Sequence, residues 1–272
     1  MNRKLLIFML LALSGVGTPL RAQTSVQGAP ENGVIIYYYV YDDGHAEVSG
    51  FRDLNNPKTG IVNVQDAVEY NGTTYPVTGI GSGGFQANGY NEVTSISLPA
   101  PVQSIQQNAF SGCTKLHTVT FRGNSQLSSI GYRAFYNCHS LKSITIPASV
   151  DTLHVRAFED CDNLDTVYFN AAHCEFPGEH DTDGSWYYTP FKHVSLSSIV
   201  IGNTVQKLPN HFLMSTNTCP TLQFASNSTL EEISSYAFSS TGYTSITLPA
   251  SVKTIGFRAF NDCEQLASVT FD

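Results

Sequence analysis

The residues of this sequence that are able to do chemistry are six cysteines, eight histidines and a glycine-rich segment. The glycine-rich segment, Gly79-Ile-Gly81-Ser-Gly-Gly84, has the G-x-G-x-x-G spacing of a dinucleotide-binding loop. The histidines show neither the H-E-x-x-H spacing of a zinc protease nor a Cys-x-x-Cys partner. Asp181-x-Asp183-Gly184 has part of the spacing of a calcium loop, but the EF-hand pattern is not completed. Because a nucleophile motif and a pair of catalytic carboxylates are also missing, we expect no catalytic residue, no metal site and no cofactor, and no enzyme activity.

Five of the six cysteines occupy the same position in a repeated segment. The segment reads Ala-Phe-x-x-Cys-x-x-Leu, and its four clearest copies begin at Ala109, Ala134, Ala157 and Ala259. A unit of this length cannot bury its own apolar face, so it must stack on its neighbours as a solenoid. We therefore expect a buried column of free thiols, although thiols of adjacent coils are close to bonding distance and a disulfide stays an alternative. The cysteines at this position are Cys113, Cys138, Cys161, Cys219 and Cys263.

Each unit also contains a short run in which apolar and polar residues alternate. Val119-Thr-Phe121 and Ile144-Thr-Ile146 are two examples. A period of two residues predicts a β-strand with one buried and one solvated face. The glycine-rich segment belongs to the same pattern, because Ile80-Gly81-x-x-Gly84-Phe85 aligns with Ile130-Gly131-x-x-Ala134-Phe135. The glycines are therefore repeat positions, which disfavours the dinucleotide interpretation.

The fuller form of the repeat, Ile-Gly-x-x-Ala-Phe-x-x-Cys-x-x-Leu-x-x-Val-x-Ile-Pro, resembles the leucine-rich repeat and, within it, the BspA-like family of bacterial surface proteins. The resemblance covers residues 77–272, in which we count about eight units, with a long variant unit near 170–200. It implies an α/β to mostly β fold. We expect a leucine-rich repeat solenoid with a parallel sheet on the concave side and short helical turns on the convex side.

The residues before the repeats predict an export signal and a cap. Residues 1–22 combine a basic start, a short apolar stretch and a small residue for cleavage, which is the pattern of a signal peptide. The apolar stretch is too short to span a bilayer, and we expect no transmembrane segment. Residues 23–76 are expected to form an amino-terminal β-hairpin cap over the first repeat. Within it, Asn71-Gly72 predicts a two-residue hairpin turn, since both positions need positive φ.

The charge and the last strand bear on the choice of partner. The protein is acidic, with a formal net charge of −8 at pH 7. Phosphate binding needs a basic face, so nucleic acid is a poor partner. The final strand carries an apolar row, Leu266, Val269 and Phe271, that no further repeat covers in this sequence. Two interpretations stay open, a truncated sequence and end-to-end self-association through this row.

Two sets of residues are candidates for ligand binding. One is the outward row of the sheet, which strand alternation places as a ladder of mostly hydroxyl side chains. β-propensity and solubility alone would produce the same row, so a purely structural role stays open. The other set contains the only tryptophan and lies on the long variant unit, where aromatic side chains are common anchors at interfaces and on sugars. The candidates are Thr118, Thr120, Ser143, Thr145, Thr166 and Tyr168 on the sheet, and Trp186, Tyr187 and Tyr188 on the variant unit.

The family resemblance implies the function. Proteins of this kind are exported to the cell surface, the periplasm or the medium, and they adhere to host or bacterial surface proteins or glycans. We therefore expect an adhesion or recognition surface. Two alternatives stay open: a structural envelope protein without a soluble ligand, and a glycan-active enzyme, which the missing acid/base motif disfavours.

Overall fold

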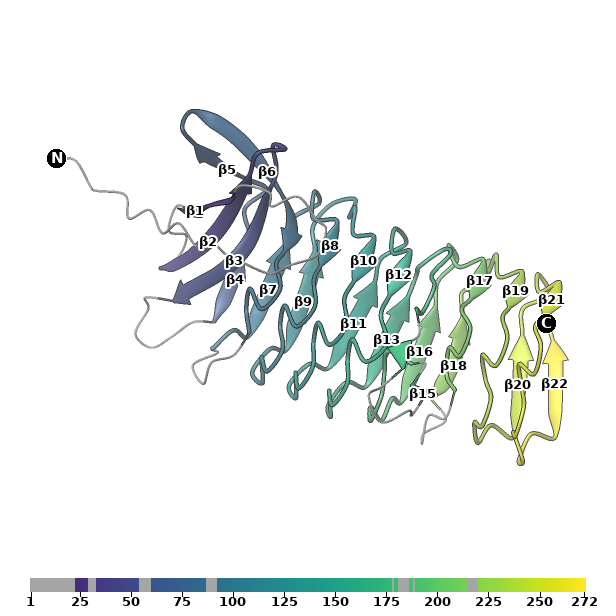
Figure 1. The fold of residues 1–272 in the computed structure, drawn as a ribbon. Coiled ribbons are helices and arrows are strands. Elements are labelled where there is room, and N and C mark those ends of the chain that lie inside the picture. The colour runs from purple at the N-terminus through teal and green to yellow at the C-terminus, as the bar shows by residue number, and fades with distance from the viewer. Residues whose placement is uncertain are drawn as a thin grey trace.

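The computed structural model describes residues 23–28, 33–53, 60–86, 92–177, 179–180, 186–187, 189–214 and 220–272. These residues form an elongated stack of coils with a β cap at its amino-terminal end (Figure 1). Every regular element among the described residues is a β-strand. The predicted signal peptide, the Asp181–Asp183 segment and Cys219 lie outside the described residues.

The cap is built from strands that mostly pair antiparallel. β1 (Gln23–Gln27) pairs with β2 (Val34–Tyr41), and β2 pairs with β3 (Ala46–Asp53). β5 (Ala67–Tyr70) and β6 (Thr73–Ile80) form the predicted hairpin. Its turn residues Asn71 and Gly72 have φ angles of 50° and 75°, which confirms the two-residue turn. β3 also pairs parallel with β6, and this contact joins the cap to the coils.

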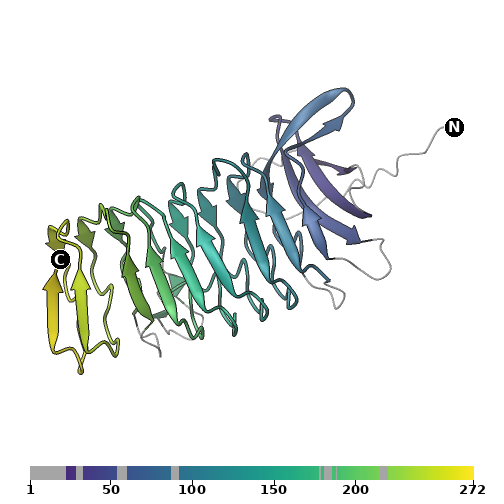
Figure 2. The ribbon, with the colours of Figure 1, turned by 180° about the vertical axis from the view of Figure 1, so that it is seen from behind.

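A row of four-residue strands forms the first ladder of the solenoid. Within each of its three sheets, β4-β7-β9, β11-β13-β16-β18 and β20-β22, the strands pair parallel and in register. Ile144, for example, lies opposite Val167, and Val167 lies opposite Ile199. Figure 2 shows the row as successive parallel arrows. β4 (Ile61–Asn63) of the cap extends the row by pairing with its first strand. The strands are β7 (Ser95–Leu98), β9 (Thr118–Phe121), β11 (Ser143–Ile146), β13 (Thr166–Phe169), β16 (Ser198–Ile201), β18 (Thr221–Phe224), β20 (Ser245–Leu248) and β22 (Ser268–Phe271).

A second ladder consists of two-residue strands that begin at the end of β6. These strands also pair parallel, for example Ile105 opposite Ile130 and Ile130 opposite Leu153. In the long variant unit the ladder continues through two isolated bridges, from Thr152 to Glu175 and from His173 to Lys207. The strands are β8 (Ser104–Ile105), β10 (Ser129–Ile130), β12 (Thr152–Leu153), β17 (Lys207–Leu208), β19 (Glu232–Ile233) and β21 (Thr254–Ile255).

The Ala-Phe segments form a third row, which consists of turns. Helical turns were expected here, and that expectation is wrong, since the described residues contain no helix. The backbone of each segment bonds in two directions: the N–H of Ala134 bonds to the carbonyl of Gly131, whereas the N–H of Phe135 bonds to Ala157 in the next coil. An α-helix would need every N–H to bond four residues back. Positive φ angles, such as 52° at Arg133, turn the chain between these two directions.

Glycine at the Ile-Gly position lets successive coils approach closely. A side chain at Gly131 would begin 2.7 Å from the backbone nitrogen of Gln107. At Gly81 it would begin 2.7 Å from the carbonyl oxygen of Val48 in the cap. Both distances are shorter than real Cβ contacts. The structure therefore assigns the G-x-G-x-x-G segment to packing between the cap and the first coil.

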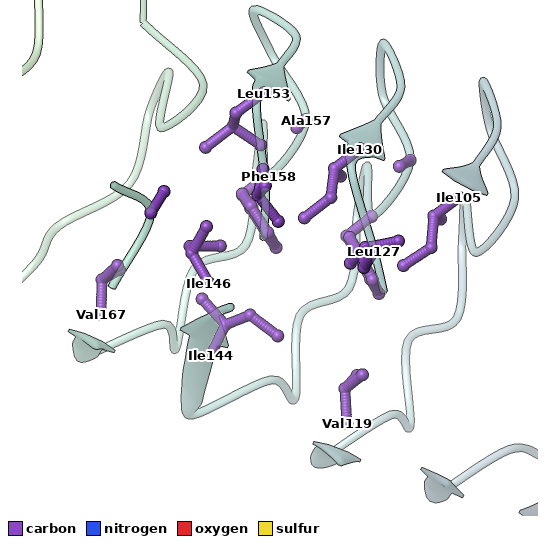
Figure 3. Packing of buried hydrophobic residues seen from close by; sticks show 14 of the residues in the cluster. Ile105, Val119, Leu127, Ile130, Ile144, Ile146, Leu153, Ala157, Phe158 and Val167 are labelled. Atoms are coloured by element: carbon purple, nitrogen blue, oxygen red, sulfur yellow. The ribbon is translucent and has the colours of Figure 1, made fainter. Parts of the chain in front are cut away.

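The core is a continuous column of apolar side chains that runs along the solenoid. Figure 3 shows part of it, with Ile105, Ile130 and Leu153 of successive coils and the ring of Phe158. The phenylalanine rings of the turns stack with centroids 4.9–5.5 Å apart. The cap contributes the first ring, so it buries the side chains of the first coil. The column begins with Phe51, whose ring is tilted by 38° against that of Phe85, and the stacked rings are Phe85, Phe110, Phe135, Phe158 and Phe191.

The repeat cysteines lie beside this ring column. Cys113, Cys138 and Cys161 are fully buried, and each thiol donates a hydrogen bond of 3.1–3.3 Å to the carbonyl oxygen of the turn phenylalanine in the preceding coil. Cys263 makes the same bond at 3.0 Å but is only partly buried. All of these thiols, and that of Cys174, are free. The prediction of free thiols is therefore confirmed for the described cysteines.

The long variant unit keeps its place in the column although its sequence departs from the repeat. Pro190 takes the alanine position, because the N–H of Phe158 bonds to its carbonyl, and Phe191 stacks on Phe158. One coil later the N–H of Leu213 bonds to the carbonyl of Ala237, so leucine takes the phenylalanine position. The ring column is therefore interrupted before Phe238.

Candidate functional site

The outer face of the four-residue strands is regular and polar. The burial of β11 alternates strictly, with Ser143 and Thr145 exposed and Ile144 and Ile146 buried. This alternation confirms the predicted outward direction of the row. The residues of the row that the structure places at least partly in solvent are Ser95, Ser97, Thr118, Thr120, Ser143, Thr145, Thr166, Tyr168, Ser198, Ser245, Thr247, Ser268 and Thr270.

An open groove of about 750 Å³ crosses this face where β11 and β13 begin. Its floor is formed by outward residues of the two strands, and its sides by the loops that lead into them. Tyr168 is the one lining residue with a phenyl ring, and it is 43% exposed. The lining residues are His117, Ser140, Lys142, Ser143, Asp162, Asn163, Leu164, Asp165, Thr166, Tyr168 and Ser195.

Hydrogen bonds fix the carboxylate of Asp165 in the groove. Hydrogen bonds from Ser197 and Thr166 lower the pKa of Asp165, and the Thr166 hydroxyl donates to its Oδ2 at 2.9 Å. Asp162 Oδ2 lies 2.7 Å from Nδ1 of His139. With its pKa lowered, the Asp165 carboxylate accepts hydrogen bonds and does not serve as a proton donor near neutral pH. The groove is therefore equipped to bind hydroxyl or amide donors.

A second open groove, of about 630 Å³, lies at the other end of the strands. Thr120 of β9 and Thr145 of β11 line it, together with Phe121 and the loop that contains Pro147. The two grooves therefore share β11, whose outward residues Ser143 and Thr145 point into one groove each.

The structure brings together part of the predicted site. Ser143, Thr166 and Tyr168 meet in the first groove, and Thr120 and Thr145 meet in the second. Thr118 is exposed on the same row but lines neither groove.

The aromatic candidates belong to a different part of the solenoid. β15 (Trp186–Tyr187) pairs antiparallel with β14 (Glu179–His180). The chain leaves the coil after Phe176 and rejoins it at Pro190, between the second ladder and the turns. This hairpin is therefore inserted at a different corner from the four-residue strands. Tyr188 lies outside the described residues.

Four loop residues of the first groove were not predicted from the sequence, namely Lys142, Asp162, Asn163 and Asp165. They flank the leucine of the Cys-x-x-Leu segment, at positions that vary between repeats. The signal that would have found them is position: these residues directly precede the strands that carry the hydroxyl row.

One group of side chains in the described part of the chain has ligand atoms close enough together to hold a metal ion, namely Glu159, Asp160 and His193. It lies on the turns, away from the grooves. Arg133, at 2.9 Å, and Lys192, at 3.4 Å, already pair with Glu159. A metal cation would have to compete with these side chains, so the group does not fit a metal site.

Comparison with known families agrees with the repeat. The model of the BspA type leucine rich repeat region matches six copies over residues 78–178 and 187–272, which is well over half of the chain. The chain belongs to this family. The matched ranges include all lining residues of both grooves. They include only part of the β14–β15 insertion.

Solved structures similar to this BspA-type chain are leucine-rich repeat proteins of bacteria. The T. pallidum leucine rich repeat protein is 20% identical over 88% of this chain and 90% of its own, with a TM-score of 0.51, and it supports the fold. A leucine rich cell surface protein from Faecalibacterium prausnitzii is 24% identical over 91% of this chain, with a TM-score of 0.49, and this chain spans 55% of it. A leucine-rich repeat protein from Bacteroides capillosus is 33% identical over 53% of this chain and 97% of its own, with a TM-score of 0.45. The comparison with curated proteins found no match.

Within the ranges that the structure describes, no helix is long and apolar enough to cross a bilayer.

Proposed function

We propose that this protein is an exported adhesion or recognition module whose binding surface is the outer face of the four-residue strands. The observation that carries the proposal is the first groove, in which hydroxyls, an amide, the carboxylates of Asp162 and Asp165 and the exposed ring of Tyr168 meet where two strands of a regular sheet begin. Side chains on a rigid sheet are held in place before a ligand arrives, so little conformational entropy is lost on binding.

The chemistry of the groove suits a glycan or a polar protein surface. Sugar hydroxyls donate to carboxylates such as Asp165 and accept from hydroxyls and from Lys142. The exposed ring of Tyr168 supplies an apolar face for a sugar ring or an aliphatic side chain. The ligand is therefore sought among the proteins and glycans of host or bacterial surfaces.

Export is part of the proposal. The pattern of residues 1–22 and the membership of the BspA-type family support a location at the cell surface, in the periplasm or in the medium. Protection of the protein in intact cells from an added protease would count against surface exposure.

The test uses purified protein on arrays of glycans and extracellular-matrix proteins. We expect Ser143→Arg, which fills the groove, and Tyr168→Ala, which removes its ring, to abolish binding. Ser245→Arg is the matched control, because Ser245 has the same position in the same Ser-Ile-Thr sequence and is also exposed, but lies outside both grooves. Thermal melts show whether each variant is folded.

The outcomes separate the alternatives. If binding survives Ser143→Arg and Tyr168→Ala but is lost in Trp186→Ala, the ligand binds at the β14–β15 insertion and the groove proposal is wrong. Binding to no member of the arrays would favour a structural envelope protein. Turnover of a glycan would favour an enzyme.

A further inference from the structure

The ladder of four-residue strands is interrupted in two places, between β9 and β11 and between β18 and β20. Wherever two coils pair through this ladder, the residue after the later strand donates its N–H to the last residue of the earlier one, as Asn170 does to Ile146. The same bond is made by Arg122, Gly202, Ala225 and Asp272. After β11 and β20 this position holds Pro147 and Pro249, which have no N–H. Both interruptions between coils thus coincide with a proline that cannot make the bond.

The first interruption leaves backbone acceptors without a donor. Paired coils are also joined at the start of the strands, where for example the N–H of Asp165 bonds to the carbonyl of Lys142. No backbone hydrogen bond joins β9 to β11, and the structure describes every residue of both strands. The carbonyls of His117 and Phe121, which occupy the two acceptor positions, therefore receive no N–H from the next coil. Carbonyls of this kind are satisfied by water or by a ligand.

The second groove lies over this interruption. Thr120 and Phe121 line it on the side of β9, and Thr145 and Pro147 line it on the side of β11. β9 and β11 are neighbours in the row of strands (Figure 1). His117, at the other end of the interruption, lines the first groove. The interruption therefore leads from one groove to the other over the four residues of β11, a length of roughly 13 Å.

The lining of the second groove is neutral. None of its lining residues carries a charge. Arg122, which follows β9, is directed to the cap, where its Nη2 lies 3.4 Å from Oδ1 of Asp66. A charged ligand would lose its hydration in the groove without meeting an opposite charge. The groove combines hydroxyls and the amide of Asn124 with the apolar surfaces of Phe121 and Pro147, and a neutral sugar has the matching hydroxyls and apolar face.

We propose that the interruption between β9 and β11 binds a neutral glycan chain, with one sugar ring in the second groove and the following units leading to the first groove. Hydroxyls of the sugar displace water and donate to the carbonyl of Phe121, and they bond to the exposed hydroxyl of Thr145. Pro147 supplies apolar surface for the ring. This inference rests on the proposed function, because it names the class of glycan that the outer face of the strands binds and the position of its chain.

The coil of β20 provides a matched control. Its segment Ser245-Ile-Thr-Leu-Pro-Ala-Ser-Val252 differs at one position from Ser143-Ile-Thr-Ile-Pro-Ala-Ser-Val150 of the β11 coil. It also follows an interruption, but there the hydroxyl of Tyr243 donates at 2.7 Å to the carbonyl of the residue before β18. The hydroxyl of Thr247 lies 3.1 Å from that of Thr270. None of these residues lines either groove.

The experiment applies the full chain to an array of neutral chains of one to four glucose, galactose, mannose or N-acetylglucosamine units, together with galacturonate chains of the same lengths. Calorimetry then measures the affinity of each chain that binds. We expect saturable binding of a neutral chain and none of galacturonate. A single sugar should bind at least about tenfold more weakly than the chain of four, because only the chain reaches both grooves.

One pair of variants tests the hydroxyl of the second groove. Thr145→Val removes the hydroxyl and keeps the shape of the side chain, so it should weaken binding of the neutral chain by about tenfold. Thr247→Val makes the same change in β20 and should leave binding unchanged. Thermal melts show whether both variants are folded.

A second pair of variants tests the interruption itself. Pro147→Ala supplies an N–H for the carbonyl of Phe121, as Ala225 does for that of Ile201, so it should also weaken binding. Pro249→Ala makes the same change after β20 and should leave binding unchanged.

The outcomes distinguish this inference from the proposed function. The inference is overturned if no neutral chain binds, if galacturonate binds more tightly than the neutral chains, or if Thr145→Val and Pro147→Ala bind as tightly as the wild type. A ligand that is lost in Ser143→Arg and Tyr168→Ala but kept in Thr145→Val and Pro147→Ala would support the proposed function alone. Loss of a neutral chain in both sets of variants would support both.

Discussion

At the scale of single residues, Phe135 shows how the core is packed. Its ring lies between those of Phe110 and Phe158, with centroid distances of 4.9 Å and 5.1 Å. The ring is fully buried. We expect Phe135→Ala to lower the free energy of unfolding by about 3–5 kcal/mol, because it leaves a cavity in a closely packed column of rings. Urea denaturation measures the loss.

Phe260 is the matched control for this substitution. It stacks only on Phe238, at 5.4 Å, and is partly exposed. Phe260→Ala should therefore cost clearly less than Phe135→Ala. Equal losses for the two variants would contradict the role assigned to the continuous column.

Cys174 gives a prediction about pH. Burial raises the pKa of its thiol to about 12, whereas an exposed thiol titrates near 8.5. Between these values the unfolded chain has lost the thiol proton and the folded chain has kept it. The thiol therefore makes stability fall as pH rises, by about 1.4 kcal/mol per pH unit. We expect the stability of Cys174→Ala to fall less steeply above about pH 8.5 than that of the wild type. Parallel pH profiles would show that the thiol is not protected in this way.

At the scale of secondary-structure elements, the turn segments show where prediction from the sequence failed. Sequence patterns predicted the strands closely, since Ile144-Thr-Ile146 lies in β11 and Val119-Thr-Phe121 in β9. They did not predict the conformation of the turns. Helical turns were expected from the family resemblance, and the hydrogen bonds between coils were not considered. Each turn is stabilised by bonds to the next coil, as from Phe135 to Ala157, and a sequence of one unit carries no signal for such bonds.

Left-handed residues in these turns give a prediction at the element scale. Ser240 is exposed and has a φ of 57°, which is unfavourable for any residue with a Cβ. Ser240→Gly should raise the free energy of unfolding by about 0.5–1 kcal/mol, after the added flexibility of the unfolded chain is subtracted. Ser245→Gly, in a strand, should lower it by a similar amount. Thermal or urea melts of both variants check the opposite signs, and two losses would contradict the argument.

The candidate site shows the same limit of prediction. Ser143, Thr166 and Tyr168 were found because strand alternation fixes their direction. Asp162 and Asp165 were not found, because only the stacking of coils brings their loops beside the strands. Conversely, Trp186 was singled out by its rarity, and rarity does not indicate which corner of a coil a residue occupies.

The whole molecule is less uniform than its repeats suggest. The ring column runs from Phe51 to Phe191 and resumes at Phe238, with Leu213 at the position between. The last coil is also more open, since Phe257 is 65% and Phe271 53% exposed. We expect amides of β19–β22 to exchange faster than those of β8–β12. Hydrogen exchange followed by mass spectrometry tests this expectation, and uniform protection along the solenoid would refute it.

Self-association is a separate prediction at this scale. Leu266 and Val269 are partly buried, and Phe271 is exposed beside them. If this row pairs two copies end to end, light scattering should show a dimer that Phe271→Lys converts to a monomer. A wild-type monomer at all concentrations would count against it.

The chain departs from the coil between Phe176 and Pro190. This departure marks a position at which other loops can be inserted by design. The bridges at His173 and Glu175 and the stacking of Phe191 keep the scaffold intact around the departure. Extra polypeptide therefore enters at this point without disturbing the layers on either side. An unrelated loop grafted here would be displayed on the outside of a rigid rod, at a fixed distance from the groove that is set by the number of coils between them.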